Sequence, residues 1–210
     1  MGDLFQYDSK FGRIMAKLAD CVTVSLLWIV FCLPGVTAGA ATTALYYSAV
    51  KFLREDRSTA VKEFWHSFKS NFKQSTIVML LALFFSLGWG LACLTVYEKF
   101  AASLLIVYLV YFIVLAFGIM WLHYIFSYIA RFQDTLSTVL KNTLYICLSN
   151  FPYSLLVVTL FAMVLFFMAI TLPTSLWALL ALPAVYAVLV SLILEPIYKK
   201  YLPDEPDEET

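Results

Sequence analysis

Long uncharged apolar runs alternate along this chain with short segments that hold most of its lysines and arginines. Because a helix needs about 20 mostly apolar residues to cross about 30 Å of hydrocarbon, each long run predicts a membrane span. Pro34-Gly35 divides the first apolar region, since Pro-Gly is a turn signal that ends a helix. The expected fold class is all-α, a polytopic transmembrane helix bundle of about six spans. The predicted spans are residues 14–33, 37–53, 76–97, 101–130, 152–171 and 175–195.

The basic residues predict the orientation of these spans. They gather before the first run, between residues 51 and 73, between residues 131 and 141, and after the last run. Cytoplasmic loops are enriched in Lys and Arg, so all of these segments are expected in the cytoplasm, together with both termini. An even number of crossings, or a re-entrant loop, must then separate the first two basic segments. We predict two crossings, which places residues 34–36 outside, and keep the re-entrant loop as the alternative.

Both long cytoplasmic connections have the periodicity of an amphipathic helix. In residues 58–74 the aromatic side chains share one face and the polar ones point elsewhere, and in residues 133–149 leucines and a valine recur at similar spacing. Both patterns are typical of helices that lie in the headgroup layer. The candidate surface residues of the first connection are Phe64, Trp65, Phe68, Lys69, Asn71 and Lys73.

The composition agrees with a membrane protein. Hydrophobic residues make up 62% of the chain and charged residues 13%, against roughly 45–50% and 25% in soluble proteins. The formal net charge of zero gives no reason to expect a nucleic-acid partner, and the partner that we expect is the lipid bilayer. Residues 1–202 are interpreted as one membrane domain, and the acidic tail at 203–210 is expected to be disordered.

Ionisable groups inside a membrane are costly, so each one is a candidate for a structural pair or a functional site. If the first two spans form a hairpin that turns at residues 34–36, Asp20 lies opposite Val50 and Lys51. An Asp20–Lys51 ion pair is the structural interpretation, and a proton or ion site is the functional alternative.

Three further polar residues lie in or beside the predicted spans. His123 is two turns before Arg131 in an aromatic helix, where an isolated histidine is usually hydrogen-bonded to a neighbour; a proton relay or a ligand contact is the alternative. Glu195 stands four residues before Lys199, a favourable spacing for an ion pair on a helix. We interpret Glu195 as the cytoplasmic end of the last span.

Residues 37–44 are eight small residues in succession. Small residues let helix backbones approach closely in lipid, so this span is predicted at the centre of the bundle. The alternative is that its threonines line a polar path.

The sequence contains no motif that indicates catalysis or metal binding. HExxH, GxSxG and Walker A patterns are absent, and the four cysteines, Cys21, Cys32, Cys93 and Cys147, have no metal-ligand spacing. We therefore expect no catalytic residue, no cofactor and no metal, and a protein that is not an enzyme.

Three segments carry a resemblance to a known family. They are PGVTAG at 34–39 with ALYY at 44–47, FWHSFKSNFKQS at 64–75, and LKN at 140–142 with NFP at 150–152. Together they are similar to YesL-like bacterial membrane proteins, a family classed as a domain of unknown function. The resemblance covers nearly the whole chain. It implies a multi-pass protein of the bacterial plasma membrane, whose family genes often lie beside carbohydrate ABC-transporter genes, and it implies no catalytic residues.

Two functions follow from these observations. The first is an accessory or regulatory component of carbohydrate (ABC-type) uptake, which acts by binding sugar ABC-transporter subunits. A homo-oligomer is the other association that we consider. The alternative is a small-solute transporter or channel that uses its own helix bundle, since Pro/Gly-interrupted spans can mark transporter sites.

Overall fold

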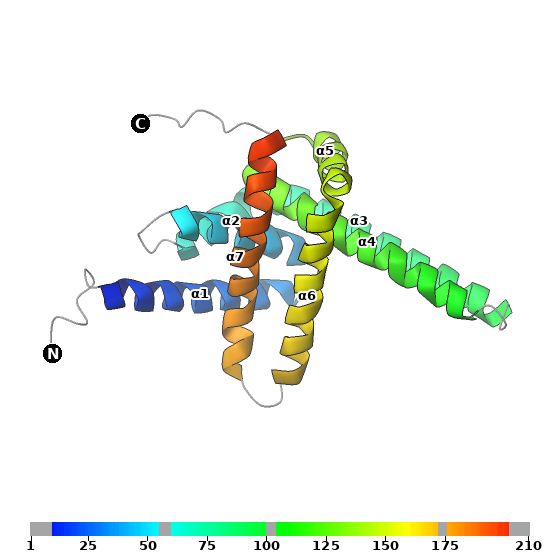
Figure 1. The fold of residues 1–210 in the computed structure, drawn as a ribbon, viewed down its shortest axis with the longest axis horizontal. Helices are drawn as coiled ribbons and strands as arrows, with labels where there is room; N and C mark the ends of the chain where they lie inside the picture. Colours follow the sequence, from blue (N-terminus) through cyan, green and yellow to red (C-terminus); the bar gives the residue numbers. More distant parts are fainter. Residues whose placement is uncertain (1–9, 55–59, 100–103, 172–175, 202–210) are drawn as a thin grey trace.

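The structure, a computed structural model, describes residues 10–54, 60–99, 104–171 and 176–201, and every regular element in these ranges is an α-helix (Figure 1). Five of the helices are long and apolar enough to cross a membrane. The predicted all-α fold is therefore confirmed. The helices are α1 (Lys10–Cys32), α2 (Ala38–Arg54), α3 (Ala60–Lys99), α4 (Leu104–Arg131), α5 (Leu136–Ser149), α6 (Phe151–Thr171) and α7 (Leu176–Tyr201).

Most helices begin and end close to the predicted limits. The predicted span 152–171 is α6, and the predicted surface helix 133–149 is α5. α7 continues past the predicted end at residue 195 to Tyr201. α2 has 17 residues, which is short for a span. The acidic tail at 203–210 and the connection at 172–174 lie outside the described residues.

α3 differs from the prediction, because one helix of 40 residues replaces the expected surface helix at 58–74 and span at 76–97. No glycine or proline occurs between Ala60 and Leu87, so nothing in the sequence ends a helix there. The basic amphipathic segment and the apolar segment are consecutive parts of the same rod.

α2 lies at the centre of the fold, packed against α1, α3, α4 and α7. Ala40, Ala41 and Ala44 are fully buried. A Cβ atom added to Gly39 would come within 2.5 Å of the Ser75 carbonyl oxygen on α3, so only glycine allows this approach. The prediction that the small-residue segment packs at the centre is confirmed.

α1 and α2 form the predicted hairpin. The turn between them contains Gly35, whose φ of +72° lies in the left-handed region that favours glycine. Trp28 Nε1 of α1 donates a hydrogen bond to Thr42 Oγ1 of α2 at 3.2 Å, which is the expected pairing for a turn at residues 34–36. The register of the hairpin was therefore predicted correctly.

One contact bears on the depth of this hairpin in the membrane. Phe31, one turn before Pro34, has its ring centroid 4.7 Å from that of Phe68 at the beginning of α3. Two full crossings would place the turn at residues 34–36 and the segment 58–74 on opposite membrane faces, about 30 Å apart. The contact favours the re-entrant alternative for α1 and α2.

The aromatic face of the 58–74 segment packs on protein instead of lying in the headgroup layer. Phe64 is fully buried and Phe68 is buried, and both rings contact Phe31 of α1. This part of α3 is amphipathic as predicted, but α1 covers its aromatic face. α5 also packs on protein, since Val139 and Cys147 are buried against the rest of the fold.

The second half of α3 and the first part of α4 extend together away from the other helices (Figure 1). We call residues 80–96 and 106–113 the arm. Its large apolar side chains are mostly exposed, and Phe84 reaches 80%. In the same view α6 and α7 run in a different direction from α1 and α2, so the apolar helices do not form one parallel bundle (Figure 1).

Candidate functional site

A cavity of about 320 Å³ lies among the helices of the central fold. Residues of α1, α2, α3, α4, α6 and α7 line it, and most of them are apolar. Its volume is at the lower end of the range for small-molecule sites, about 300–1,000 Å³. The polar side chains on its wall are Trp28, Thr42, Tyr46, His123, Ser127 and Tyr186.

His123 projects from α4 into the wall of this cavity. Its Nδ1 atom lies 2.7 Å from the carbonyl oxygen of Ile119, one turn earlier. A carbonyl oxygen only accepts, so Nδ1 carries the hydrogen, and in the neutral ring Nε2 keeps a lone pair. The ring also packs edge-on against Phe161 of α6 and Tyr186 of α7. The predicted hydrogen bond to a neighbour is confirmed, and it leaves Nε2 as an acceptor.

Tyr186 reaches the same cavity from α7. Its ring centroid lies 5.8 Å from that of His123. The hydroxyl oxygen is buried and has no hydrogen-bond partner among the described residues. A buried hydroxyl without a partner is costly, so this part of α7 carries an unsatisfied polar group close to the cavity.

Pro183 helps to position this part of α7. Proline inside a helix disturbs the backbone hydrogen bonds around it. The amide of Ala184, the next residue, donates to Ser25 Oγ of α1 at 3.1 Å. This contact holds α7 against α1, and Pro183 itself lines the cavity.

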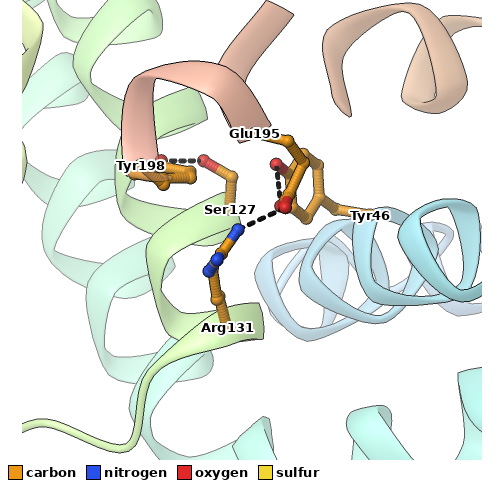
Figure 2. Close-up of polar contacts among 5 residues, drawn as sticks. All are labelled: Tyr46, Ser127, Arg131, Glu195 and Tyr198. Carbon is orange, nitrogen blue, oxygen red and sulfur yellow. Dashed lines mark hydrogen bonds and ion pairs between the residues drawn. The ribbon is translucent and has the colours of Figure 1, made fainter. Parts of the chain in front are cut away.

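An ion pair lies about one helical turn beyond the cavity. Arg131, the last residue of α4, donates to Glu195 Oε2 of α7, and each side chain is 15% exposed (Figure 2). The Tyr46 hydroxyl of α2 donates to Glu195 Oε1 at 3.2 Å (Figure 2). Three helices that are far apart in the sequence therefore meet at one carboxylate.

A second contact joins α4 and α7 beside this ion pair. We call the two contacts together the polar junction. The hydroxyls of Ser127 on α4 and Tyr198 on α7 are 2.5 Å apart (Figure 2). Tyr46 and Ser127 both line the cavity as well. The polar junction thus forms one end of the cavity, and a movement of α7 against α4 would alter both.

Glu195 makes contacts with other helices that the sequence did not predict. Its spacing on α7 predicts Lys199 as a partner, and the structure shows Arg131 and Tyr46 binding its carboxylate. Arg131 and Glu195 are 64 residues apart, and the approach of α4 to α7 that joins them is a tertiary feature.

Asp20 and Lys51 lie in the predicted neighbourhood, but the described contacts include no ion pair between them. Asp20 lines a recess of about 20 Å³ together with Ser48 and Ala49 of α2. The Lys51 ammonium lies 6.0 Å from the ring centroid of Tyr47, one turn earlier on the same face of α2. The contact of Asp20 with this part of α2 agrees with the predicted hairpin register. Asp20 and His123 line separate cavities and do not form one site.

The remaining candidate residues of the first amphipathic segment lie on the exposed side of α3. The Lys69 ammonium stands 5.1 Å from the ring centroid of Trp65, and Lys73 is exposed. Asn71 Nδ2 donates to Ser67 Oγ at 3.2 Å within the same helix. These contacts are local, and they bring none of these residues near the cavity.

Sequence reasoning missed the tyrosines. Tyr46 and Tyr198 support the junction, and Tyr124 accepts a hydrogen bond from Ser154 Oγ at 2.8 Å. Tyr128 donates to Asp134 at 2.7 Å and thereby ties α4 to the beginning of α5. A signal was present, because a tyrosine in an apolar run buries a hydroxyl that needs a partner, whereas a phenylalanine does not.

Comparison with known proteins gives one family match. Residues 21–94 match the model of DUF624, described as a protein of unknown function. The matched segment begins within α1, contains α2, and ends within the α3 part of the arm. No curated protein and no solved structure matches the chain.

Proposed function

We propose that this chain is an accessory or regulatory membrane protein that binds the transmembrane helices of a partner through the arm. The proposed partner is a subunit of a carbohydrate ABC-type transporter. In this proposal the protein is not an enzyme. Two observations support this role. One is the similarity of the sequence to YesL-like proteins, and the other is the exposed arm.

The arm has the surface expected of a docking helix. It exposes large apolar side chains on several sides, among them Phe84, Leu87 and Leu91. Lipid tails would cover such a surface equally well, so apolarity alone does not select a partner. Gly88 and Ala92, one turn apart on α3, are exposed small residues, and no atom lies within 4 Å of a Cβ added to Gly88. Small residues at this spacing allow close approach of another helix.

The same proposal places the protein in the bacterial plasma membrane with both termini in the cytoplasm. The basic ends of α2, α4 and α7 support one common side. Lys51 precedes the end of α2, Arg131 ends α4, and Lys199 and Lys200 are in the last turn of α7. The Arg131–Glu195 pair joins two of these ends directly. A common basic side is what the positive-inside rule requires.

The test is affinity purification of tagged full-length protein from its native membrane in a mild detergent, followed by mass spectrometry. We expect sugar-transporter subunits to co-purify. Ala92→Leu should remove them, because a larger side chain blocks close approach at the arm. Ala162→Leu is the matched control, since Ala162 is also an exposed alanine, on α6. A preparation that contains only this chain, as monomer or homo-oligomer, would contradict the transporter-accessory role.

The cavity supports a second candidate function, a small-solute transporter that uses its own helices. This candidate requires a solute to pass the wall that carries His123 and Tyr186. Uptake into proteoliposomes would then fall strongly in His123→Ala, and in Asp20→Asn if a proton or ion is coupled to transport. Absence of uptake by a correctly folded, reconstituted protein contradicts it.

A further inference from the structure

The inward face of α6 has different surroundings in its two halves. Ser154 and Val157, in the first half, are fully buried against the rest of the fold. The same helical face continues, at spacings of three and four residues, to Val164, Leu165 and Met168. These three side chains line the cavity, and none of them is buried. Protein therefore covers the first half of this face, and the second half borders open volume.

Polar groups on the cavity wall already bond within the protein. Trp28 Nε1 donates to Thr42 Oγ1 at 3.2 Å, and the Tyr46 hydroxyl donates to Glu195 Oε1 at 3.2 Å. The Ser127 hydroxyl donates to a backbone carbonyl oxygen one turn earlier at 2.7 Å. A polar ligand would lose its hydrogen bonds to water here and find few replacements, so the wall favours an apolar one.

His123 and Tyr186 add little hydrogen-bonding capacity to the wall. Nδ1 of His123 donates to the carbonyl oxygen of Ile119, which leaves Nε2 as an acceptor. The Tyr186 hydroxyl is buried inside the wall, out of reach of a molecule in the cavity. A water molecule needs about two to four polar partners, so water does not fill this volume, whereas apolar molecules do enter apolar cavities.

We propose that the cavity holds part of one acyl chain of a bilayer phospholipid, whose headgroup stays outside. The volume of about 320 Å³ corresponds to roughly ten groups of water size at about 30 Å³ each, enough for about ten carbon atoms of a chain. The lining residues of α4, α6 and α7 all fall inside segments that are long and apolar enough to cross a membrane. Hydrocarbon is the solvent around such segments, so acyl chains are the apolar groups available at this depth.

The chain has a route into the cavity beside α6. Met163, Phe166 and Phe167, on the other sides of this helix, are at least half exposed, and Leu165 on the cavity wall is 49% exposed. One helix therefore separates the cavity from the bilayer. The contacts of the polar junction join α2, α4 and α7, so a chain that enters beside α6 leaves them intact.

This inference does not rest on the accessory role. The cavity lies among the helices of the central fold, whereas Gly88 and Ala92 are in the arm, so a partner could be lost while the acyl chain stays bound. A bound chain would occupy the volume that a solute needs, and the proposal therefore opposes the transporter candidate.

The test is photolabelling of the purified full-length protein in phosphatidylcholine nanodiscs that contain a phosphatidylcholine with a diazirine in the middle of one acyl chain. We expect adducts on Ala187 and Val190 of α7, which line the cavity and are only 4% and 3% exposed. Lipid that merely surrounds the protein labels exposed side chains. Adducts confined to exposed residues, such as Phe84 and Phe166, overturn the proposal.

A fatty acid with the same diazirine distinguishes the two sources of an acyl chain. A free carboxylate that followed its chain among apolar walls would need a counter-charge, and the nearby Arg131 already pairs with Glu195. We therefore expect the phospholipid probe to label Val190. Labelling of Val190 by the fatty acid but not by the phospholipid contradicts the proposed source.

A variant pair tests whether the adducts come from the cavity. Leu165→Trp places a larger side chain on the wall and should reduce labelling of Val190 on the order of tenfold. Leu156→Trp is the matched control, because Leu156 is a leucine of similar exposure on α6 that does not line the cavity. Unchanged labelling of Val190 in a folded Leu165→Trp protein contradicts the proposal. The wild-type labelling pattern decides the matter if that variant does not fold.

Discussion

The α1–α2 hairpin and the α3–α4 arm are both made of apolar helices, yet they have opposite surroundings. In the hairpin, α2 is enclosed by α1, α3, α4 and α7, and Ala40 and Ala41 are fully buried. In the arm, Phe84 and Leu87 are largely exposed. Hydrophobicity alone does not distinguish the two, because both consist of apolar runs.

Side-chain size explains the difference. The small residues at the beginning of α2 allow α3 to approach until the Ser75 carbonyl lies against Gly39. Larger side chains on the arm keep neighbouring helices at a distance, and lipid or a partner must cover them. Gly88, in the arm, has open space where Gly39 has a backbone atom. The same residue type thus has a fixed structural role in one hairpin and a free surface in the other.

The largest expected effect concerns the membrane side of the hairpin turn. Val36→Cys and Lys69→Cys, each in a chain whose natural cysteines are replaced by alanine, should react with an impermeant maleimide from the same face of intact vesicles. The reason is that Phe31 contacts Phe68, which places the turn beside the first half of α3. Labelling of the two cysteines from opposite faces would show that α1 and α2 cross the membrane completely.

The second prediction compares the loss of stability caused by alanine at Gly39 and at Gly88. Gly39→Ala should lower the free energy of unfolding by about 3 kcal/mol, because the added Cβ meets a backbone oxygen that cannot move away without shifting α3. Gly88→Ala should change it by less than about 1 kcal/mol, in the stabilising direction expected from helix propensity. Thermal or denaturant unfolding in detergent measures both. Equal losses would mean that the arm is packed as tightly as the hairpin.

A smaller loss is expected at the polar junction. Removal of one partner from a buried ion pair costs about 3–5 kcal/mol, and partial solvent access reduces this, so Arg131→Met should cost about 2 kcal/mol. The double variant Arg131→Met with Glu195→Met should recover part of the loss, because no unpaired charge remains. The same unfolding measurement applies. Additive losses would indicate that the two side chains do not interact.

The smallest effect concerns Cys147 on α5. Burial raises the pKa of the Cys147 thiol above its ordinary value, although the Ser154 hydroxyl opposes this shift. Less thiolate is then present at pH 8, so iodoacetamide should modify Cys147 more slowly than the exposed cysteine of Lys69→Cys, and the rate should rise with pH. Equal rates measured by mass spectrometry would show that α5 does not cover this thiol.

Much of the fold was predictable because it follows from local periodicity. Apolar runs of sufficient length gave the limits of α6 closely, and Pro34-Gly35 gave the turn of the first hairpin. Trp28 does pair with Thr42 as the hairpin register requires. The break expected between the amphipathic and apolar parts of α3 was wrong, since a change in polarity does not end a helix when no glycine or proline is present.

The sequence predicted several residues of the site, but it did not predict which of them are in contact. His123, Arg131 and Glu195 were candidates because polar groups in apolar runs are costly. The sequence predicted Lys199 as a partner of Glu195, because spacing within one helix is visible in it. The Arg131 partner was not predicted, because the approach of α4 to α7 is not visible there. Tyr186 was missed, since a tyrosine in an apolar run does not reveal whether its hydroxyl finds a partner.

The sequence by itself determined that this chain is a helical membrane protein, where its first hairpin turns, and which helix packs at the centre. These properties depend on hydrophobicity and side-chain size at neighbouring positions. The tertiary structure decided that Arg131 meets Glu195, that Phe31 covers the aromatic face of α3, and that His123 and Tyr186 face one cavity. Each of these contacts depends on the angle and depth at which two distant helices cross, and a single sequence does not encode that geometry in any local pattern.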